Sequence, residues 1–215
     1  MKILDGAFVT SVADGGVLPA DPGAVVALAG RSNVGKSSLV NTLLRRRVAR
    51  AGGKPGTTRL LNVYRVRASH GARGGTLRFS LVDLPGYGYA RGGDRTRRDF
   101  DALTRRFFTR LVAAPGRPPA ADAAARLAGT LLVVDMRHPG LDNDRAAHAW
   151  LVDQGCPVVV VATKGDRLSR SGRTRSQGDH EAALGCPVLP VSSRTGDGIG
   201  PLWSAMARLV AHVVR

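Results

Sequence analysis

The sequence has little cysteine, a single glutamate and no long apolar run. Its two cysteines, Cys156 and Cys186, are too few for a disulfide framework and lack the spacing of a zinc site. No apolar run approaches the roughly 18 residues that a membrane span requires, and the N-terminal residues lack the basic-then-apolar pattern of a signal peptide. These absences speak against a disulfide-rich secreted module and against a membrane span, so we expect a cytoplasmic protein.

Acidic residues are scarce relative to basic ones. The 215 residues include 28 Arg and 4 Lys against 15 Asp and 1 Glu, which gives a formal net charge of +16. Codon composition can favour Arg over Lys, but it leaves the excess of bases over acids unexplained, so the charge indicates a polyanionic partner. The hydrophobic content of 43% is high enough for a packed core and excludes wholesale disorder.

The apolar patterns predict one α/β domain. Continuous apolar runs, typical of parallel strands covered on both faces, occur at 24–29, 129–135, 157–163 and 187–191. An antiparallel pair fits the alternating segments 60–67 and 76–82. Helical spacing occurs at 37–46, from 94 onward, at 142–153 and at 199–214. We expect a six-stranded, mainly parallel sheet with one antiparallel edge strand and helices on both faces over residues 23–215, with residues 1–22 as an N-terminal extension that packs on it.

The segment after the first predicted strand matches the phosphate-loop pattern G-x-x-x-x-G-K-[ST] at every defined position: Gly30, Arg31, Ser32, Asn33, Val34, Gly35, Lys36, Ser37. It lies between a strand and a helix, as the pattern requires. Backbone N–H groups in such a loop surround phosphate oxygens, and the helix N-terminus adds its positive end. Lys36 would reach the β and γ oxygens, and Ser37 would offer its hydroxyl to Mg²⁺.

Two segments after later strands indicate which base the nucleotide carries. Thr163-Lys164-Gly165-Asp166 is similar to the N-K-x-D signature of GTP-binding proteins, with Thr in place of Asn. An Asp at the fourth position can accept hydrogen bonds from guanine and disfavours adenine, which leaves the carboxylate unpaired. Val191-Ser192-Ser193, after the next strand, supplies a third element, with the Ser193 N–H near guanine O6. The order of the three elements predicts GTP specificity.

Two further segments resemble the switches of GTPases. Asp83-Leu84-Pro85-Gly86 ends a predicted strand and matches D-x-x-G, in which the Asp binds Mg²⁺ through water and the Gly N–H contacts the γ-phosphate. Upstream, the segment 54–59 fits a first switch, whose Thr completes the Mg²⁺ coordination only when the triphosphate is bound. This pattern alone leaves both Thr57 and Thr58 as candidates.

Taken together, these motifs resemble the EngB-type GTP-binding proteins of bacteria, relatives of the Era and TrmE GTPases. The resemblance spans nearly the whole chain and includes three further strings: Pro55-Gly56-x-Thr58, Asp83-Leu84-Pro85-Gly86-Tyr87-Gly88-Tyr89-Ala90 and Asp135-x-Arg137-His138. Thr in place of Asn at position 163 is usual in that family. The resemblance implies a GTP/GDP-binding protein that acts in late assembly of the large ribosomal subunit and is linked to normal septum formation in cell division.

The resemblance also implies roles for particular residues. It assigns Mg²⁺ to Ser37 and Thr58, and it makes Lys36, Thr58 and Gly86 the expected catalytic set. Besides residues 30–37, the expected nucleotide-binding residues are Gly56, Thr57, Thr58, Arg59, Leu60, Asp83, Leu84, Pro85, Gly86, Thr163, Lys164, Gly165, Asp166, Val191, Ser192 and Ser193.

Hydrolysis is expected to be slow, because Tyr87 stands where many regulatory GTPases place a Gln that orients the attacking water. In related GTPases an Asn at the position of Asn33 helps to hold K⁺ near the phosphates, so we expect K⁺ to accelerate turnover; the other interpretation of Asn33 is a good turn former.

We expect a monomer that binds the large ribosomal subunit or its precursor through arginines on ribosomal RNA. The predicted contacts follow the first helix and the second switch: Arg45, Arg46, Arg47, Arg50, Arg91, Arg95, Arg97, Arg98, Arg105, Arg106 and Arg110. Two alternatives stay open. One is an RNA-binding scaffold whose GTP site regulates affinity without significant turnover, and the other is a metabolic nucleotide kinase, which the Thr163–Asp166 segment disfavours.

Overall fold

One mixed sheet organises the computed structural model, which describes residues 2–13, 18–19, 23–49, 60–70, 75–87, 103–111 and 125–213. Its strands in the described residues are β1 (Lys2–Val12), β2 (Gly23–Gly30), β3 (Leu61–His70), β4 (Gly75–Asp83), β5 (Ala125–Asp135), β6 (Val158–Thr163) and β7 (Val188–Pro190). They lie in the order β1-β3-β4-β2-β5-β6-β7. The neighbouring strands β4, β2, β5, β6 and β7 are parallel to one another. Their carboxyl ends therefore lie together along one side of the sheet.

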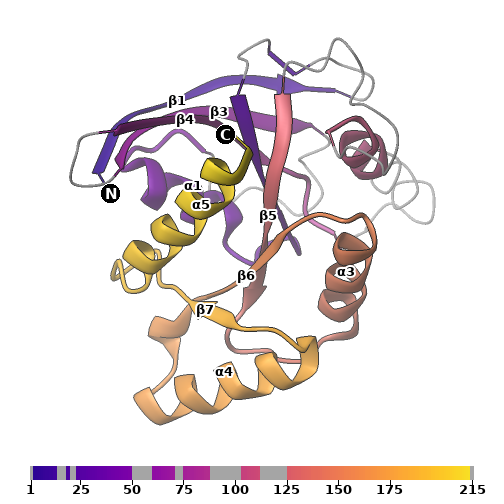
Figure 1. Cartoon of the computed structure of the whole chain (residues 1–215). Helices are drawn as coiled ribbons and strands as arrows, with labels where there is room; N and C mark the ends of the chain where they lie inside the picture. The colour runs from indigo at the N-terminus through magenta and orange to yellow at the C-terminus, as the bar shows by residue number, and fades with distance from the viewer. Residues whose placement is uncertain are drawn as a thin grey trace.

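Two layers of helix cover the sheet (Figure 1). On one face, α1 (Lys36–Leu44) and α5 (Ile199–Val213) bury apolar side chains such as Leu39 and Met206 against β2 and β4. On the other face, the helical residues 103–111 and α3 (Asp142–Asp153) pack against β2, β5 and β6. The helix α4 (Arg170–Leu184) lies beside β7 and α3. Because both faces are covered, the central strands are continuous apolar runs, as predicted.

Both tryptophans pack among aromatic side chains. Trp203 of α5 meets the edge of Phe79 on β4 at 6.4 Å between ring centroids. On the opposite face, Trp150 of α3 meets Phe108 at 5.2 Å, and the Arg105 guanidinium lies 5.8 Å from the Trp150 ring. The helices that carry them, α3 and α5, confirm the helical spacing expected at 142–153 and 199–214.

The predicted fold class is confirmed, with two differences in the sheet. It holds seven strands in the described residues instead of six, and the antiparallel strand β3 is not at the edge, because β1 pairs antiparallel with its outer side. The additional strand comes from the segment that we expected to be an extension. Its pairing carries two register shifts, between Ile3 and Asp5 and between Phe8 and Thr10. Such bulges break the two-residue alternation by which a strand is recognised in sequence.

Glycine at position 129 allows β5 to approach its neighbours closely. A Cβ there would lie 2.8 Å from the Pro157 carbonyl oxygen and 2.9 Å from Leu209 of α5. We predict that Gly129→Ala lowers the free energy of unfolding by about 1–3 kcal/mol, because it overpacks a site bounded by backbone. The measurement is urea unfolding.

The matched control is Gly178→Ala in the middle of α4, where a Cβ would meet nothing within 4 Å. This change should leave stability equal or raise it by up to about 1 kcal/mol, because Ala favours helix over Gly. Equal effects of the two substitutions would contradict the packing argument.

Candidate functional site

The loop between β2 and α1 has the backbone that a phosphate loop needs. Gly35 adopts φ 116° and Asn33 φ 63°, both in the left-handed region, and α1 begins directly afterwards at Lys36. A Cβ on Gly30 would lie 2.5 Å from the Val133 carbonyl oxygen, so the loop starts where β2 and β5 are in close contact. Glycine at 30 and 35 therefore has a local structural reason besides any ligand.

Lys36 lies beneath this loop and is only 8% exposed. Its ammonium donates hydrogen bonds to the carbonyl oxygens of Gly30 (2.9 Å) and Arg31 (3.3 Å). Burial lowers the pKa of Lys36, and the attraction of the nearby Asp83 carboxylate opposes that shift. The side chain is thus held at the loop by two neutral acceptors and one negative charge.

Asp83 ends β4 and faces the start of α1. Burial raises the pKa of Asp83 to about 6, while Lys36 and a hydrogen bond from Ser37 act in the opposite direction. Its Oδ1 is buried and has no hydrogen-bond partner among the described residues. A carboxylate with unused acceptor capacity next to a serine hydroxyl is a donor set that suits a hard divalent cation such as Mg²⁺.

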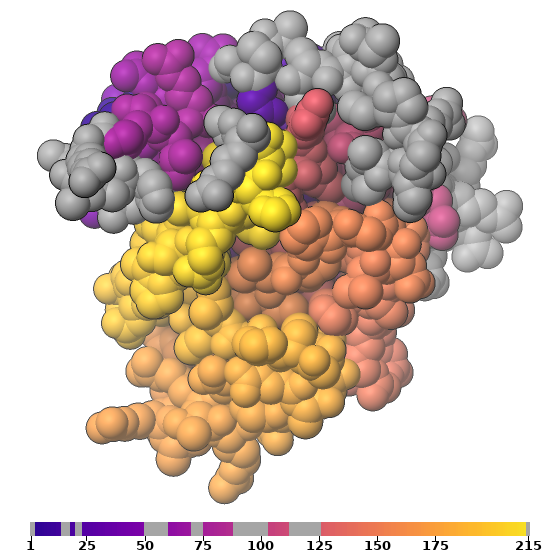
Figure 2. Space-filling view, in the orientation of Figure 1, coloured from indigo at the N-terminus to yellow at the C-terminus, as the bar shows by residue number. Residues whose placement is uncertain are grey.

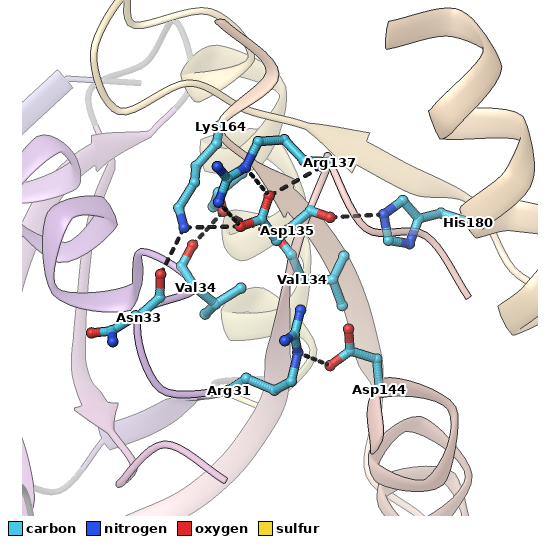
Figure 3. Close-up of polar contacts among 10 residues, drawn as sticks. Arg31, Asn33, Val34, Val134, Asp135, Arg137, Asp144, Lys164 and His180 are labelled. Carbon is cyan, nitrogen blue, oxygen red and sulfur yellow. Dashed lines mark hydrogen bonds and ion pairs between the residues drawn. The ribbon is translucent and has the colours of Figure 1, made fainter. Parts of the chain in front are cut away.

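The predicted guanine segments contact the phosphate loop directly (Figure 3). The Thr163 hydroxyl lies 2.6 Å from the Val34 carbonyl oxygen and 3.1 Å from that of Val134. The Lys164 ammonium donates to the Asn33 carbonyl oxygen at 2.7 Å. Thr163 therefore bonds to the loop from the position at which the N-K-x-D signature has Asn.

The carboxylate expected to recognise guanine is held from the side of β7. Ser192 donates its hydroxyl to Asp166 Oδ1 at 2.8 Å, and Arg194 pairs with Oδ2 at 3.4 Å. The Ser193 carbonyl oxygen accepts a hydrogen bond from Thr42 of α1 at 3.1 Å. Gly165 is buried at the start of the short 3₁₀ helix η1 (Gly165–Arg167), and Val191 is in the core. The structure thus brings the guanine segments and α1 together.

One member of this cluster, Asp135 at the end of β5, was not among the predicted site residues. Its carboxylate accepts from Lys164 Nζ (2.9 Å), from Arg137 Nε (2.9 Å) and Nη2 (2.8 Å), and from the Arg137 backbone N–H (3.1 Å). Burial alone would raise the pKa of Asp135, but the bonds from Arg137 and Lys164 outweigh it and hold the pKa well below its usual range. The only signal in the sequence was the Asp135-x-Arg137-His138 string, to which no role was assigned.

The start of the second switch lies against the phosphate loop. Leu84 N–H donates to the Leu28 carbonyl oxygen at 3.0 Å, and Ser32 N–H donates to that of Tyr87 at 3.1 Å. The Ser32 hydroxyl donates to the Gly86 carbonyl oxygen at 3.2 Å. This segment continues the direction of β4 beside β2, which places Leu84, Pro85 and Gly86 next to residues 28–32.

Several predicted site residues lie outside the described residues: Gly56, Thr57, Thr58 and Arg59. Leu60 is described and is exposed just before β3. The assignment of Thr58 to Mg²⁺ stays a prediction.

The fold and this site define a P-loop GTPase domain. The model of a family described as 50S ribosome-binding GTPase matches residues 25–164. A probable GTP-binding protein EngB of Pelotomaculum thermopropionicum is 37% identical over 98% of this chain and 98% of its own length. That of Desulfitobacterium hafniense is 35% identical over 95% and 93%. A solved structure of a probable GTP-binding protein engB, 21% identical, matches the fold with a TM-score of 0.61 over 87% of this chain and 99% of its own.

The chain belongs to the EngB family of GTP-binding proteins.

The carboxylate of Asp135 provides the first test of the site. We predict that Asp135→Asn weakens the binding of GDP and GTP by the same factor, about 10-fold, because Lys164 loses the charged acceptor that aligns it and both nucleotides carry guanine. Titration with fluorescent GDP and a non-hydrolysable GTP analogue measures this factor.

The matched control is Asp153→Asn at the exposed C-terminal end of α3, which should change neither affinity. A loss confined to one of the two nucleotides would contradict a role on the guanine side.

Proposed function

We propose that the protein is a Mg²⁺-dependent GTPase with slow intrinsic hydrolysis that acts as a nucleotide-dependent switch in assembly of the large ribosomal subunit. The observation that carries the proposal is the cluster of Lys36, Ser37 and Asp83 beside the loop, joined through Lys164 to the predicted guanine segments. We propose a cytoplasmic location and, by the family resemblance, a link to cell division. No helix within the described residues is long and apolar enough to cross a membrane.

The residues present fit the proposed Mg²⁺. Ser37 offers a hydroxyl, and Asp83 offers a buried oxygen that has no hydrogen-bond partner among the described residues. Bound there with the nucleotide, Mg²⁺ would neutralise charge on the β and γ oxygens. Lys36 would turn its ammonium from the carbonyl oxygens of Gly30 and Arg31 toward the phosphates.

Slow hydrolysis agrees with the surroundings of Tyr87. Its hydroxyl donates to Asp144 of α3 at 2.9 Å, so it is already engaged with a side chain of the protein. The exposed Asn33 side chain makes no hydrogen bond among the described residues and is available to a K⁺ ion near the phosphates. The alternative function is a scaffold whose GTP site regulates RNA affinity without significant turnover, which the engaged Tyr87 also favours.

We predict that single-turnover GTP hydrolysis is faster in K⁺ than in Na⁺, because a cation held near Asn33 adds positive charge where negative charge develops. The measurement is the rate of phosphate release at constant ionic strength, with and without large ribosomal subunits. Asn33→Ala should remove the difference between the two salts. Equal rates in both salts would contradict the K⁺ site, and absence of hydrolysis with subunits present would favour the scaffold.

The charge of the described surface supports an RNA partner. Arg65 and Arg67 on β3 and Arg78 on β4 are exposed on one sheet face, and Arg67 lies directly opposite Arg78 in the antiparallel register. Like charges at such positions destabilise a sheet. The residue opposite Arg67 on β1, Asp5, pairs instead with Arg46 at 3.7 Å. This strip of arginines therefore suits the phosphates of an RNA backbone.

A second basic surface lies on α4 and the turn before it, where Arg167, Arg170 and Arg175 are exposed. Figure 2 shows side chains of this orange segment projecting from the lower end of the molecule. Of the predicted RNA contacts, Arg45, Arg46 and Arg47 are exposed after α1, and Arg105 lies over Trp150. Arg106 and Arg110 belong to the helical residues 103–111. The others, Arg50, Arg91, Arg95, Arg97 and Arg98, lie outside the described residues.

We predict that the double variant Arg67→Gln/Arg78→Gln binds large ribosomal subunits more weakly and with a smaller dependence on salt, by about one unit of logarithmic slope per lost phosphate contact. Co-sedimentation with subunits across a salt series, with a GTP analogue and with GDP, measures both quantities.

Arg208→Gln, an exposed arginine on α5 at the opposite sheet face, is the control and should leave binding unchanged. Identical salt dependence in the double variant and the parent protein would exclude the β3–β4 strip as an RNA contact. Equal binding with both nucleotides would contradict the switch.

A further inference from the structure

The first turn of α3 contains a carboxylate that neither the motifs nor the proposed reaction uses. Asp144 is 2% exposed. Its Oδ1 accepts a hydrogen bond from Arg31 Nε at 3.1 Å and another from the Tyr87 hydroxyl at 2.9 Å. Arg31 belongs to the phosphate loop and Tyr87 to the second switch, so one oxygen of α3 connects both (Figure 3 shows the bond to Arg31).

The burial of the Asp144 carboxylate is energetically unfavourable, so its position needs a structural or functional explanation. Burial raises the pKa of Asp144, and the bonds from Arg31 and Tyr87 offset only part of that effect. The other oxygen, Oδ2, is buried with no hydrogen-bond partner among the described residues. Stabilisation of the helix N-terminus does not require a buried residue, because the exposed Asp142 lies in the same turn. The buried position of the Asp144 carboxylate is therefore explained by its bonds to Arg31 and Tyr87.

Through Tyr87, Asp144 holds the segment that contains Gly86. Tyr87 follows Gly86 directly, and its carbonyl oxygen accepts from Ser32 N–H in the loop. Gly86 is so close to the loop that a Cβ on it would lie 2.7 Å from both Ser32 N and Ser32 Cα. With its hydroxyl on Asp144 and its backbone on Ser32, Tyr87 is held from two sides, and Gly86 is fixed between them.

We infer that Asp144 is a positioning residue that, through Tyr87 and Arg31, holds Gly86 against the phosphate loop and thereby favours the triphosphate over the diphosphate. The inference rests on the proposed function in one respect, the contact of Gly86 N–H with the γ-phosphate. A Gly86 that is already in place does not have to be ordered when the triphosphate binds, so its contact contributes more to affinity. GDP lacks the γ-phosphate and gains nothing from this arrangement.

The test compares Tyr87→Phe and Asp144→Asn with the parent chain. Tyr87→Phe removes only the hydroxyl, and Asp144→Asn removes the charge that pairs with Arg31. Each should weaken binding of a non-hydrolysable GTP analogue about 3- to 10-fold and change GDP binding less than about 2-fold. The double variant should lose less than the product of the two single effects, because both act through one contact. Affinities come from calorimetric titration in the presence of Mg²⁺.

The matched control is Asp142→Asn, two residues away, where the carboxylate is 90% exposed and pairs with Arg145 on the surface. It makes the same chemical change in the same helical turn and should leave both affinities unchanged. Thermal unfolding without nucleotide shows whether each variant is folded; if Asp144→Asn is not, Tyr87→Phe carries the test alone.

Equal losses for both nucleotides in Tyr87→Phe, or no loss at all, would overturn the role of Asp144. A parent chain that binds neither nucleotide would instead refute the proposed function, and the inference with it. The two failures are therefore distinguishable in one set of titrations.

Discussion

The arrangement of the site depends on two hydrogen bonds that the Lys164 ammonium donates. It bonds to the Asn33 carbonyl oxygen in the loop and to the Asp135 carboxylate at the end of β5. Loop, β5 and the segment after β6 are far apart in the sequence, and only their common edge of the parallel sheet brings them together. The backbone of Lys164 is in the left-handed region (φ 64°), directly before η1. A single positive charge thus aligns the parts that would bind phosphate and base.

Three buried carboxylates around the loop differ in how completely they are paired. Asp135 receives four hydrogen bonds from Arg137 and Lys164, and its pKa is held low. Asp83 and Asp144 each retain an oxygen without a partner among the described residues, and burial raises the pKa of both. Full pairing suits a structural anchor, whereas unused acceptor capacity at a buried charge suits a ligand or a moving partner. Charge and burial alone would not have separated these roles, but hydrogen-bond partners do.

The sequence predicted the parts of the fold whose pattern is local. Continuous apolar runs located β2, β5, β6 and β7, because parallel strands are buried on both faces. The sequence patterns did not predict β1, because its two bulges break the alternation. They also gave no bounds for α4, because only Ser176 and His180 are buried in that helix and it has no apolar stripe. The phosphate-loop and guanine motifs were recognisable because their spacing is fixed along the chain. Asp135 stood out only as part of the Asp135-x-Arg137-His138 string, and Asp144 did not stand out, because the site residues that they bind, Lys164 and Arg31, lie 29 and 113 positions away in the sequence.

Two groups of basic side chains in the described residues have different physical consequences. The arginines and lysines at the site are engaged: Arg31 with Asp144, Arg137 and Lys164 with Asp135, Lys36 with backbone carbonyl oxygens. The exposed arginines of β3, β4 and α4 lie elsewhere, so a polyanion could bind them without competing with nucleotide for the same cations. Under the proposed function, any coupling between RNA bound at these arginines and nucleotide bound at the loop would depend on where β3 and β4 begin and end. β3 and β4 are the strands between the two switch segments, and β4 runs directly into Asp83 and Gly86. Under the proposed function, RNA phosphates that bind Arg67 and Arg78 would act on β4, the strand whose end carries the residues proposed to contact Mg²⁺ and the γ-phosphate.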